Sequence, residues 1–249
     1  MGGPQKINAW RSSLTGTARR GRKSANERLH LEGIIYVLRA GSPWRDLPGW
    51  FGPWQTVYGK FRRWSAAGLW ATMLGHLREV FADHEYTMVD STIMRVHQDA
   101  SGPRGGQDAQ AMGRSRGGLS SKIHMACDAL GYPLGFVITG GERADCTQAK
   151  RLLKRFLQPD SAAIMDAGYD SDDIRQFVEE SGAAAVIAYR SNRSKIPAFD
   201  KHLYRERFQI ENLFQRLKRY RRIATRYEKL HRTFAAMVAI ACVLLWLRR

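Results

Sequence analysis

The N-terminal part of the chain carries apolar residues at helical spacing. One amphipathic stretch begins after Asn26, which we expect to cap a helix, and ends at Gly41. A second helix is expected to start at Pro53, because proline fits the first turn of a helix, and a third to cover 69–81. We therefore predict a small helical domain over 26–82. Its three short helices resemble a helix-turn-helix DNA-binding module, and a plain helical bundle is the open alternative.

From residue 86 onward, short apolar runs alternate with helical segments. The expected elements, in order, are a strand ending at Asp90, a Gly- and Ser-containing loop in SRGGLSSK, a hairpin over 122–141, a helix over 144–157, a strand ending at Asp166, a helix capped by Ser171, a strand over 183–190 and a long basic helix from about 203. Strands that alternate with helices indicate an α/β fold, in which helices flank a mixed sheet. We predict that this second domain spans 86–249.

Basic residues outnumber acidic residues by a wide margin. The 249 residues include 40 Lys and Arg against 23 Asp and Glu, which gives a formal net charge of +17. Such an excess favours a polyanionic partner, most often nucleic acid. Residues 1–25 are basic, contain Gly and Ser and show no periodicity, so we expect a flexible tail there. The cysteines, Cys127, Cys146 and Cys242, lack the spacing of a zinc site and fit a reducing compartment.

One segment, 233–247, is uncharged for 15 residues. A helix that spans a membrane needs about 20 such residues, so we expect a helix buried in the folded core. A membrane-anchored basic protein stays an alternative. No apolar signal core opens the sequence, and we expect a cytoplasmic protein without a membrane partner.

Three carboxylates are candidates for a single site. Asp90 and Asp166 each follow an apolar run at the expected end of a strand, where the active groups of open sheets gather. Glu211 lies on the basic helix, in the stretch YRERFQIENLFQRLKR. Oxygen ligands from neighbouring strand ends and a packed helix suit Mg²⁺, and two such ions can drive phosphoryl transfer. Taken singly, each aspartate could instead cap a loop.

One face of the basic helix brings Glu211 together with two bases and a phenol. Tyr204, Arg207 and Lys218 lie at offsets −7, −4 and +7 from Glu211, and these offsets share one face of a helix. Arg207 and Lys218 can hold phosphate groups beside the acids, and Tyr204 can stack on a base. A surface helix laced with salt bridges, with Tyr204 packed against it, is the alternative.

The spacing Y-x2-R-x3-E-x6-K of these four residues is the tail signature of a bacterial family of insertion-sequence transposases, the family named for insertion sequence five, which the chain resembles. Further similar stretches, in the same order, are 43–64, 89–102, 113–134, 165–172 and 221–229. The resemblance covers roughly residues 26–247. The chain departs from the family pattern at Ala167, where a Lys is common, and at Asp99, where a His is common.

The resemblance implies both a fold and a reaction. It implies an RNase H-like catalytic domain in which Asp90, Asp166 and Glu211 form a catalytic triad that binds Mg²⁺ or Mn²⁺. It also implies a DNA transposase, which cuts DNA at the terminal inverted repeats of its element and joins the freed 3′-hydroxyl to target DNA. The N-terminal domain would help to bind the repeats. A homodimer or a larger assembly on DNA is expected, because two DNA ends have to be brought together.

Further basic residues are candidates for contact with double-stranded DNA. Lys60, Arg62 and Arg63 lie opposite the apolar face of the second expected helix. Arg116 and Lys122 lie in or near the Gly-rich loop, where we expect them to contact phosphate groups.

Two other functions stay open at this point. A catalytically inactive remnant of a transposase would bind inverted-repeat DNA without cutting it, and the unusual first 25 residues motivate that alternative. An RNase H-like nuclease would cut DNA without joining the products.

Overall fold

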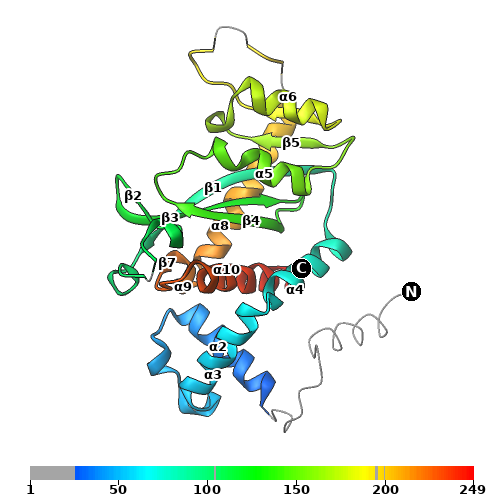
Figure 1. Ribbon diagram of the computed structural model, residues 1–249. Helices are drawn as coiled ribbons and strands as arrows, with labels where there is room; N and C mark the ends of the chain where they lie inside the picture. The colour runs from blue at the N-terminus through cyan, green and yellow to red at the C-terminus, as the bar shows by residue number, and fades with distance from the viewer. Residues whose placement is uncertain (1–25, 104, 194–195, 199) are drawn as a thin grey trace, which may run out of the picture.

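A mixed β-sheet forms the centre of the molecule, and helices cover both of its faces (Figure 1). The computed structural model describes residues 26–103, 105–193, 196–198 and 200–249. The tail expected over 1–25 lies outside the described residues. The predicted α/β fold, with helices on both sides of a mixed sheet, is confirmed.

Five strands of the sheet lie side by side in the order β4, β3, β1, β5 and β6. The strands are β1 (Tyr86–Val96), β2 (Gly113–Ser115), β3 (Gly118–Cys127), β4 (Pro133–Gly140), β5 (Ala162–Met165), β6 (Ala184–Ile187) and β7 (Thr225–Arg226). β3 is antiparallel to both β1 and β4, whereas β5 runs parallel to β1 and to β6. Short β2 pairs with β3, and β7 pairs with the far end of β1.

Seven helices of nine or more residues are present among the described residues. They are α2 (Glu27–Ala40), α3 (Trp54–Ala66), α4 (Leu69–Phe81), α5 (Cys146–Phe156), α6 (Asp172–Glu180), α8 (Phe208–Lys218) and α10 (His231–Trp246). Two shorter helices, α7 (Lys201–Tyr204) and α9 (Arg221–Ala224), flank α8, and a 3₁₀ turn over Arg205–Arg207 joins α7 to α8. The long basic helix expected from about 203 is therefore present, and it begins at α7.

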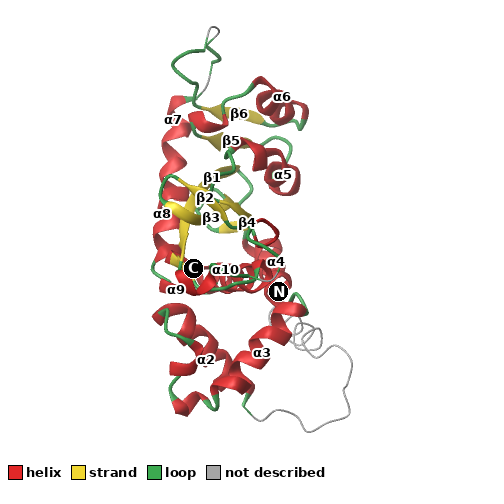
Figure 2. Ribbon diagram, turned by 60° about the vertical axis from the view of Figure 1, so that its left-hand side comes forward, coloured by secondary structure: helices red, strands yellow, loops and turns green. Residues whose placement is uncertain are grey.

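The two faces of the sheet bury separate hydrophobic clusters. Val89 and Ala163 belong to a cluster with the apolar residues of α5 and α6. Met88 and Ile164 belong to a larger cluster with α8 and α10. Figure 2 shows α8 and α5 on opposite sides of the sheet. Because successive side chains of a strand point to opposite faces, the position of a residue in β1 decides which helical layer it meets.

The N-terminal helices α2, α3 and α4 pack mainly onto the helices α9 and α10 (Figure 1). Helix α4 also contacts β4 of the sheet. Their buried residues, among them Ile34, Phe61 and Trp70, belong to the same cluster as α10. Gly41 ends α2 in the left-handed conformation, at φ 72°, and its N–H bonds to the carbonyl of Val37. The helix boundaries expected at Gly41, Pro53 and 69–81 are confirmed.

Local signals after residue 86 also match the structure. The hydroxyl of Ser171 accepts the N–H of Ile174 and so caps α6, as the sequence predicts. The hairpin over 122–141 is formed by β3 and β4, and the helix over 144–157 is α5. All but the last residue of the uncharged segment 233–247 lie in α10, most of whose residues are buried in the core. Among the described residues, no helix is long and apolar enough to cross a membrane.

Three local expectations are wrong. β1 does not end at Asp90 but continues to Val96, because Ser91 and the residues after it pair with β3. The stretch SRGGLSSK is mostly strand, since β2 and β3 form a tight hairpin within it. Asn26 precedes α2, but its side chain makes no capping hydrogen bond.

Candidate active site

The sheet register brings Asp90 and Asp166 to the same level on neighbouring strands. Met88 of β1 pairs with Ile164 of β5 in the parallel ladder. Two residues further along each strand stand Asp90 and Asp166, so their side chains leave the same face as Met88 and Ile164. That face is the one covered by α8.

Arg207 connects Asp90 to Glu211. One terminal nitrogen of its guanidinium, Nη1, donates to Oδ2 of Asp90 at 2.7 Å, and the other, Nη2, donates to Oε1 of Glu211. The Asp90 side chain is 16% exposed, whereas that of Glu211 is 53% exposed. The N–H of Ser91 donates to the second carboxylate oxygen of Asp90 at 2.7 Å. A single guanidinium therefore holds the strand acid and the helix acid together.

Burial, and to a lesser extent the negative charge of Asp166, raises the pKa of the Asp90 carboxyl from 3.8 to about 6. The Ser91 N–H and the Arg207 guanidinium act in the opposite direction, but they do not offset burial. The ionised form of Asp90 is thus held at a free-energy cost in the folded protein. A cation beside such a buried, ionised carboxylate would stabilise its charge.

Asp166 stands directly after β5, in extended backbone at the start of a 3₁₀ turn over Ala167–Tyr169. Its Oδ1 accepts the N–H of Gly168 at 2.8 Å, which fixes the carboxylate at the strand end. Ala167, the position at which the chain departs from the resembled family, begins that turn.

Asp90, Asp166 and Glu211 offer only carboxylate oxygens, which are the donors that Mg²⁺ and Mn²⁺ take in proteins. Nowhere in the described part of the chain do three or more His, Cys, Asp or Glu side chains stand close enough to hold a metal ion as they are. The Arg207 guanidinium instead supplies the positive charge between Asp90 and Glu211. The donor set fits a divalent cation in its chemistry, and Arg207 occupies the position of a counter-ion.

A second polar network, which sequence reasoning missed, lies behind Asp90 on the opposite face of the sheet. The Ser91 hydroxyl donates to Oδ1 of Asp145 at 2.7 Å, and Nζ of Lys122 donates to the same oxygen at 2.8 Å. Lys122 also donates to the carbonyl of Arg143 at 2.7 Å. Asp145 precedes α5, where an acid is ordinary in any helix, so its residue type gave no signal.

The basic residues predicted to contact DNA fall into two groups. Arg62, Arg63, Arg116 and Lys218 are exposed. Lys60 and Lys122 are buried, since Lys60 pairs with Glu27 at 3.2 Å and Lys122 pairs with Asp145. Tyr204 is half-buried beside Arg207, at the end of α7. The structure therefore brings Asp90, Arg207 and Glu211 together and leaves Arg62, Arg63, Arg116 and Lys218 exposed for other contacts.

Comparison with known proteins adds a family to this geometry. The family model described as "Transposase DDE domain" matches residues 82–246, and a second one, described as "Putative transposase of IS4/5 family", matches residues 8–74. The chain belongs to the bacterial insertion-sequence transposases with a DDE domain. The resemblance seen in the sequence is thereby confirmed.

Curated relatives of this transposase point the same way. The chain is 44% identical over 131 residues to the "Putative transposase for insertion sequence element IS6501" of Brucella ovis, an alignment that covers 52% of the chain and all of the relative. It is 29% identical over 135 residues to the corresponding protein of element IS402 of Burkholderia cepacia, covering 50% of the chain and 62% of that relative.

Among solved structures, the transposase is similar to the piggyBac transposase in its synaptic complex with hairpin DNA, with a TM-score of 0.53 at 12% identity. The match covers 95% of this chain and 70% of that one. At this identity the likeness shows the fold alone, and it supports the RNase H-like arrangement of the sheet.

Proposed function

We propose that this transposase cuts DNA at the terminal inverted repeats of an insertion sequence and transfers the freed strand into target DNA. The observation that carries the proposal is the meeting of Asp90, Asp166 and the Arg207–Glu211 pair on one face of the sheet. The acids come from two strands and a helix that lie far apart in the sequence. Such convergence of acids from separate elements is typical of a catalytic site.

Asp90, Asp166 and Glu211 would hold Mg²⁺ or Mn²⁺. A bound divalent cation lowers the pKa of water and stabilises charge on phosphoryl oxygens. Burial of Asp90 beside Asp166 concentrates negative charge where the cation is needed, which the raised pKa of Asp90 reflects. Glu211, which is more exposed, is free to complete the set when Arg207 changes partner.

Arg207 would act on the DNA as well as on the acids. Its planar guanidinium binds a phosphate as readily as two carboxylates, so a DNA phosphate can take the place of Asp90 or Glu211. Lys218 lies seven residues beyond Glu211, about 10 Å along the helix axis, and is exposed for a second phosphate. Tyr204 would contact the base or sugar nearest the cut. Arg62, Arg63 and Arg116 would bind DNA further away.

The cleavage and transfer steps require two DNA ends, so we propose that the transposase acts as a dimer or larger assembly on double-stranded DNA. The piggyBac protein to which the chain is similar was solved as a synaptic complex with DNA. The net charge of +17 supports a polyanionic partner of this size.

A cleavage assay tests the proposal. Purified protein is mixed with Mn²⁺ or Mg²⁺ and a duplex that carries the inverted repeat flanking the coding sequence. We expect metal-dependent cuts and joined products from the parent. Glu211→Gln and Asp166→Asn should bind the duplex without cutting it. Glu179→Gln, at an exposed position on α6, makes the same chemical change away from the acids and should cut like the parent.

The products separate the remaining alternatives. Binding without cutting by the parent would identify a catalytically inactive remnant that occupies inverted repeats. Cutting without joined products would identify a nuclease. If the Glu211→Gln variant cuts the duplex as well as the parent does, the assignment of the acids is refuted.

A further inference from the structure

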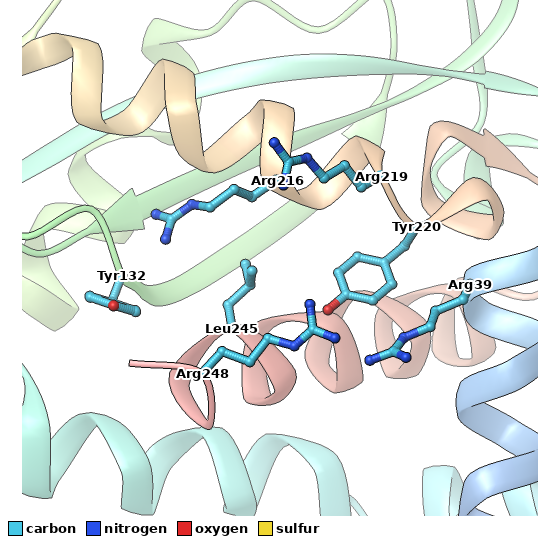
Figure 3. A pocket seen from close by; sticks show the side chains of 7 residues that line it. All are labelled: Arg39, Tyr132, Arg216, Arg219, Tyr220, Leu245 and Arg248. Atoms are coloured by element: carbon cyan, nitrogen blue, oxygen red, sulfur yellow. The ribbon is translucent and has the colours of Figure 1, made fainter.

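A cavity of about 480 Å³ lies where α2, the turn between β3 and β4, the end of α8 and the end of α10 meet (Figure 3). The polar side chains that line it are Arg39, Arg216, Arg219, Arg248, Tyr132 and Tyr220. Arg39, Arg219 and Arg248 are exposed at its rim, whereas Tyr220 is buried. The cavity is therefore open to solvent on the side of the three exposed arginines and is closed at its base by the buried Tyr220.

The four arginines of this cavity have no acidic partner among the described residues. Across the described part of the chain, none of them forms an ion pair with a carboxylate. By contrast, the nearby Arg222 pairs with Glu228 at 2.6 Å. Four guanidinium groups around one hollow repel one another and produce a strong positive potential, which an anion relieves.

Two polar atoms of the cavity residues are buried without a hydrogen-bond partner among the described residues: the hydroxyl of Tyr220 and Nε of Arg216. The Tyr220 side chain is only 4% exposed, and its hydroxyl points toward the guanidinium of Arg248 (Figure 3). Burial raises the pKa of Tyr220, so the hydroxyl keeps its proton and remains a donor. Buried donors of this kind normally have an acceptor, so the cavity lacks an acceptor that a ligand can supply.

The ring of Tyr132 and the backbone beside it hold Arg216 in place. Its guanidinium lies over the Tyr132 ring at 5.4 Å and donates through Nη2 to the carbonyl of Gly131. The Tyr132 ring in turn stacks on Trp246 at 4.8 Å. Gly131 has φ 75°, a conformation that favours glycine and shapes this turn. The arginine at the floor of the cavity is thus preorganised.

We propose that this cavity binds a backbone phosphate of the DNA, at a distance from the acids. Guanidinium groups and a tyrosine hydroxyl are the donors that recognise phosphate oxygens. The proposal rests on the DNA-cleaving function proposed above and adds a second anchoring point to it.

The geometry of α8 sets the distance between the two sites. Glu211 lies near its start and Arg219 directly after its end, eight residues apart, which is about 12 Å along the helix axis. A duplex advances about 3.4 Å per base pair, so this separation corresponds to three or four base pairs. One bound duplex can therefore reach both the acids and the cavity. Exposed Lys218, next to Arg219, adds positive charge at this end of α8.

Equilibrium binding of a short duplex to the full chain, in chelator and over a salt series, tests the proposal. Arg39→Gln/Arg248→Gln removes two exposed charges of the cavity, and Tyr220→Phe removes only the buried hydroxyl. Arg151→Gln/Lys154→Gln, on α5 across the sheet, removes the same two charges from another surface. We expect the cavity double variant to bind about tenfold more weakly, with a salt slope smaller by about 1, and the α5 variant to stay close to the parent. Tyr220→Phe should weaken binding less than the double variant.

A second titration, with pyrophosphate, distinguishes DNA from a free phosphate compound. If pyrophosphate raises the melting temperature of the parent but not of the cavity variants, while duplex affinity is the same in all, the cavity serves a free phosphate compound and the DNA assignment is wrong. Equal duplex affinity and salt slope in the cavity and α5 variants would also overturn it. Thermal melts of each variant without ligand confirm that it is folded.

Neither result depends on cleavage. A parent that binds DNA in a cavity-dependent way but does not cut it refutes only the proposed reaction. A parent that cuts and joins DNA while the cavity variants bind normally refutes only the cavity assignment.

Discussion

Removing the charge of Asp90 should stabilise the folded protein at neutral pH. The pKa of its carboxyl rises from 3.8 to about 6 on folding, mainly through burial. A difference of about 2 pKa units corresponds to about 3 kcal/mol, since each unit is worth about 1.4 kcal/mol. Asp90→Asn resembles the protonated acid, so without metal it should raise the free energy of unfolding by about that amount. The attraction of Arg207 is already included in the shift and does not reverse it.

The pH dependence gives the sign of the effect. Well below pH 3.8 the Asp90 carboxyl is protonated in both the folded and the unfolded chain, so parent and variant should be equally stable there. As the pH rises through 3.8 and then about 6, the unfolded chain loses its proton first, and the parent loses stability relative to Asp90→Asn. Urea denaturation in chelator, at several pH values, measures the difference between the two proteins.

Divalent metal provides the counterpart of this experiment. Mn²⁺ should stabilise the parent in proportion to its affinity and should stabilise Asp90→Asn much less. Asp99→Asn, at a carboxylate that is 70% exposed, serves as the control and should follow the parent. An Asp90→Asn variant no more stable than the parent at neutral pH, or equally more stable at all pH values, would refute the reasoning about burial. Equal stabilisation of both by Mn²⁺ would show that Asp90 is not a ligand.

Two further predictions concern buried charge. Asp170→Asn should lower the free energy of unfolding by about 3 kcal/mol, because the guanidinium groups of Arg175 and Arg193 share this buried carboxylate at 3.0 and 2.9 Å. Asp172→Asn, at a carboxylate that is 88% exposed, should change the free energy of unfolding by less than about 1 kcal/mol. Urea denaturation compares the two variants. Burial opposes ionisation of Asp170, but hydrogen bonds and ion pairs lower its pKa overall, so this contribution should be present above about pH 4 and be lost as the pH falls through the lowered pKa. Arg222→Met should lower the free energy of unfolding by about 3–5 kcal/mol, because it leaves Glu228 buried and unpaired. In thermal melts, the double variant Arg222→Met/Glu228→Leu should recover most of that stability. A double variant whose loss equals the sum of the two single losses would contradict the buried-pair argument.

Much of the fold could be predicted because its signals are local. Gly41 ends a helix through its own conformation, and Ser171 caps one through its own hydroxyl. The end of β1 could not be predicted in this way. Ser91 resembles a loop residue after Asp90, but it is held in the strand by pairing with His124 of β3, a partner distant in sequence.

The acids of the candidate site could be singled out from the sequence, whereas their contacts could not. Helical spacing places Arg207 beside Glu211, yet nothing in that spacing shows that Asp90, 117 residues earlier, shares the same guanidinium. Arg207 was expected to hold phosphate, and in the structure it holds two carboxylates instead. Lys60 is a basic residue of the kind that contacts DNA, but in the structure it is buried and pairs with Glu27. Its long side chain is able to turn inward.

The alternation of β1 places Asp90 and the hydrogen bond between Ser91 and Asp145 on opposite faces of the sheet. Asp90 faces α8 and meets Arg207, while Ser91, one residue on, faces α5 and meets Asp145. A slip of one residue in the pairing of β1 would exchange the two side chains and bury each against the wrong partners. β1 pairs with β3, β5 and β7, so three neighbours oppose such a slip. The same pairings that carry β1 beyond Asp90 therefore keep the carboxylate aimed at the helix that bears Glu211.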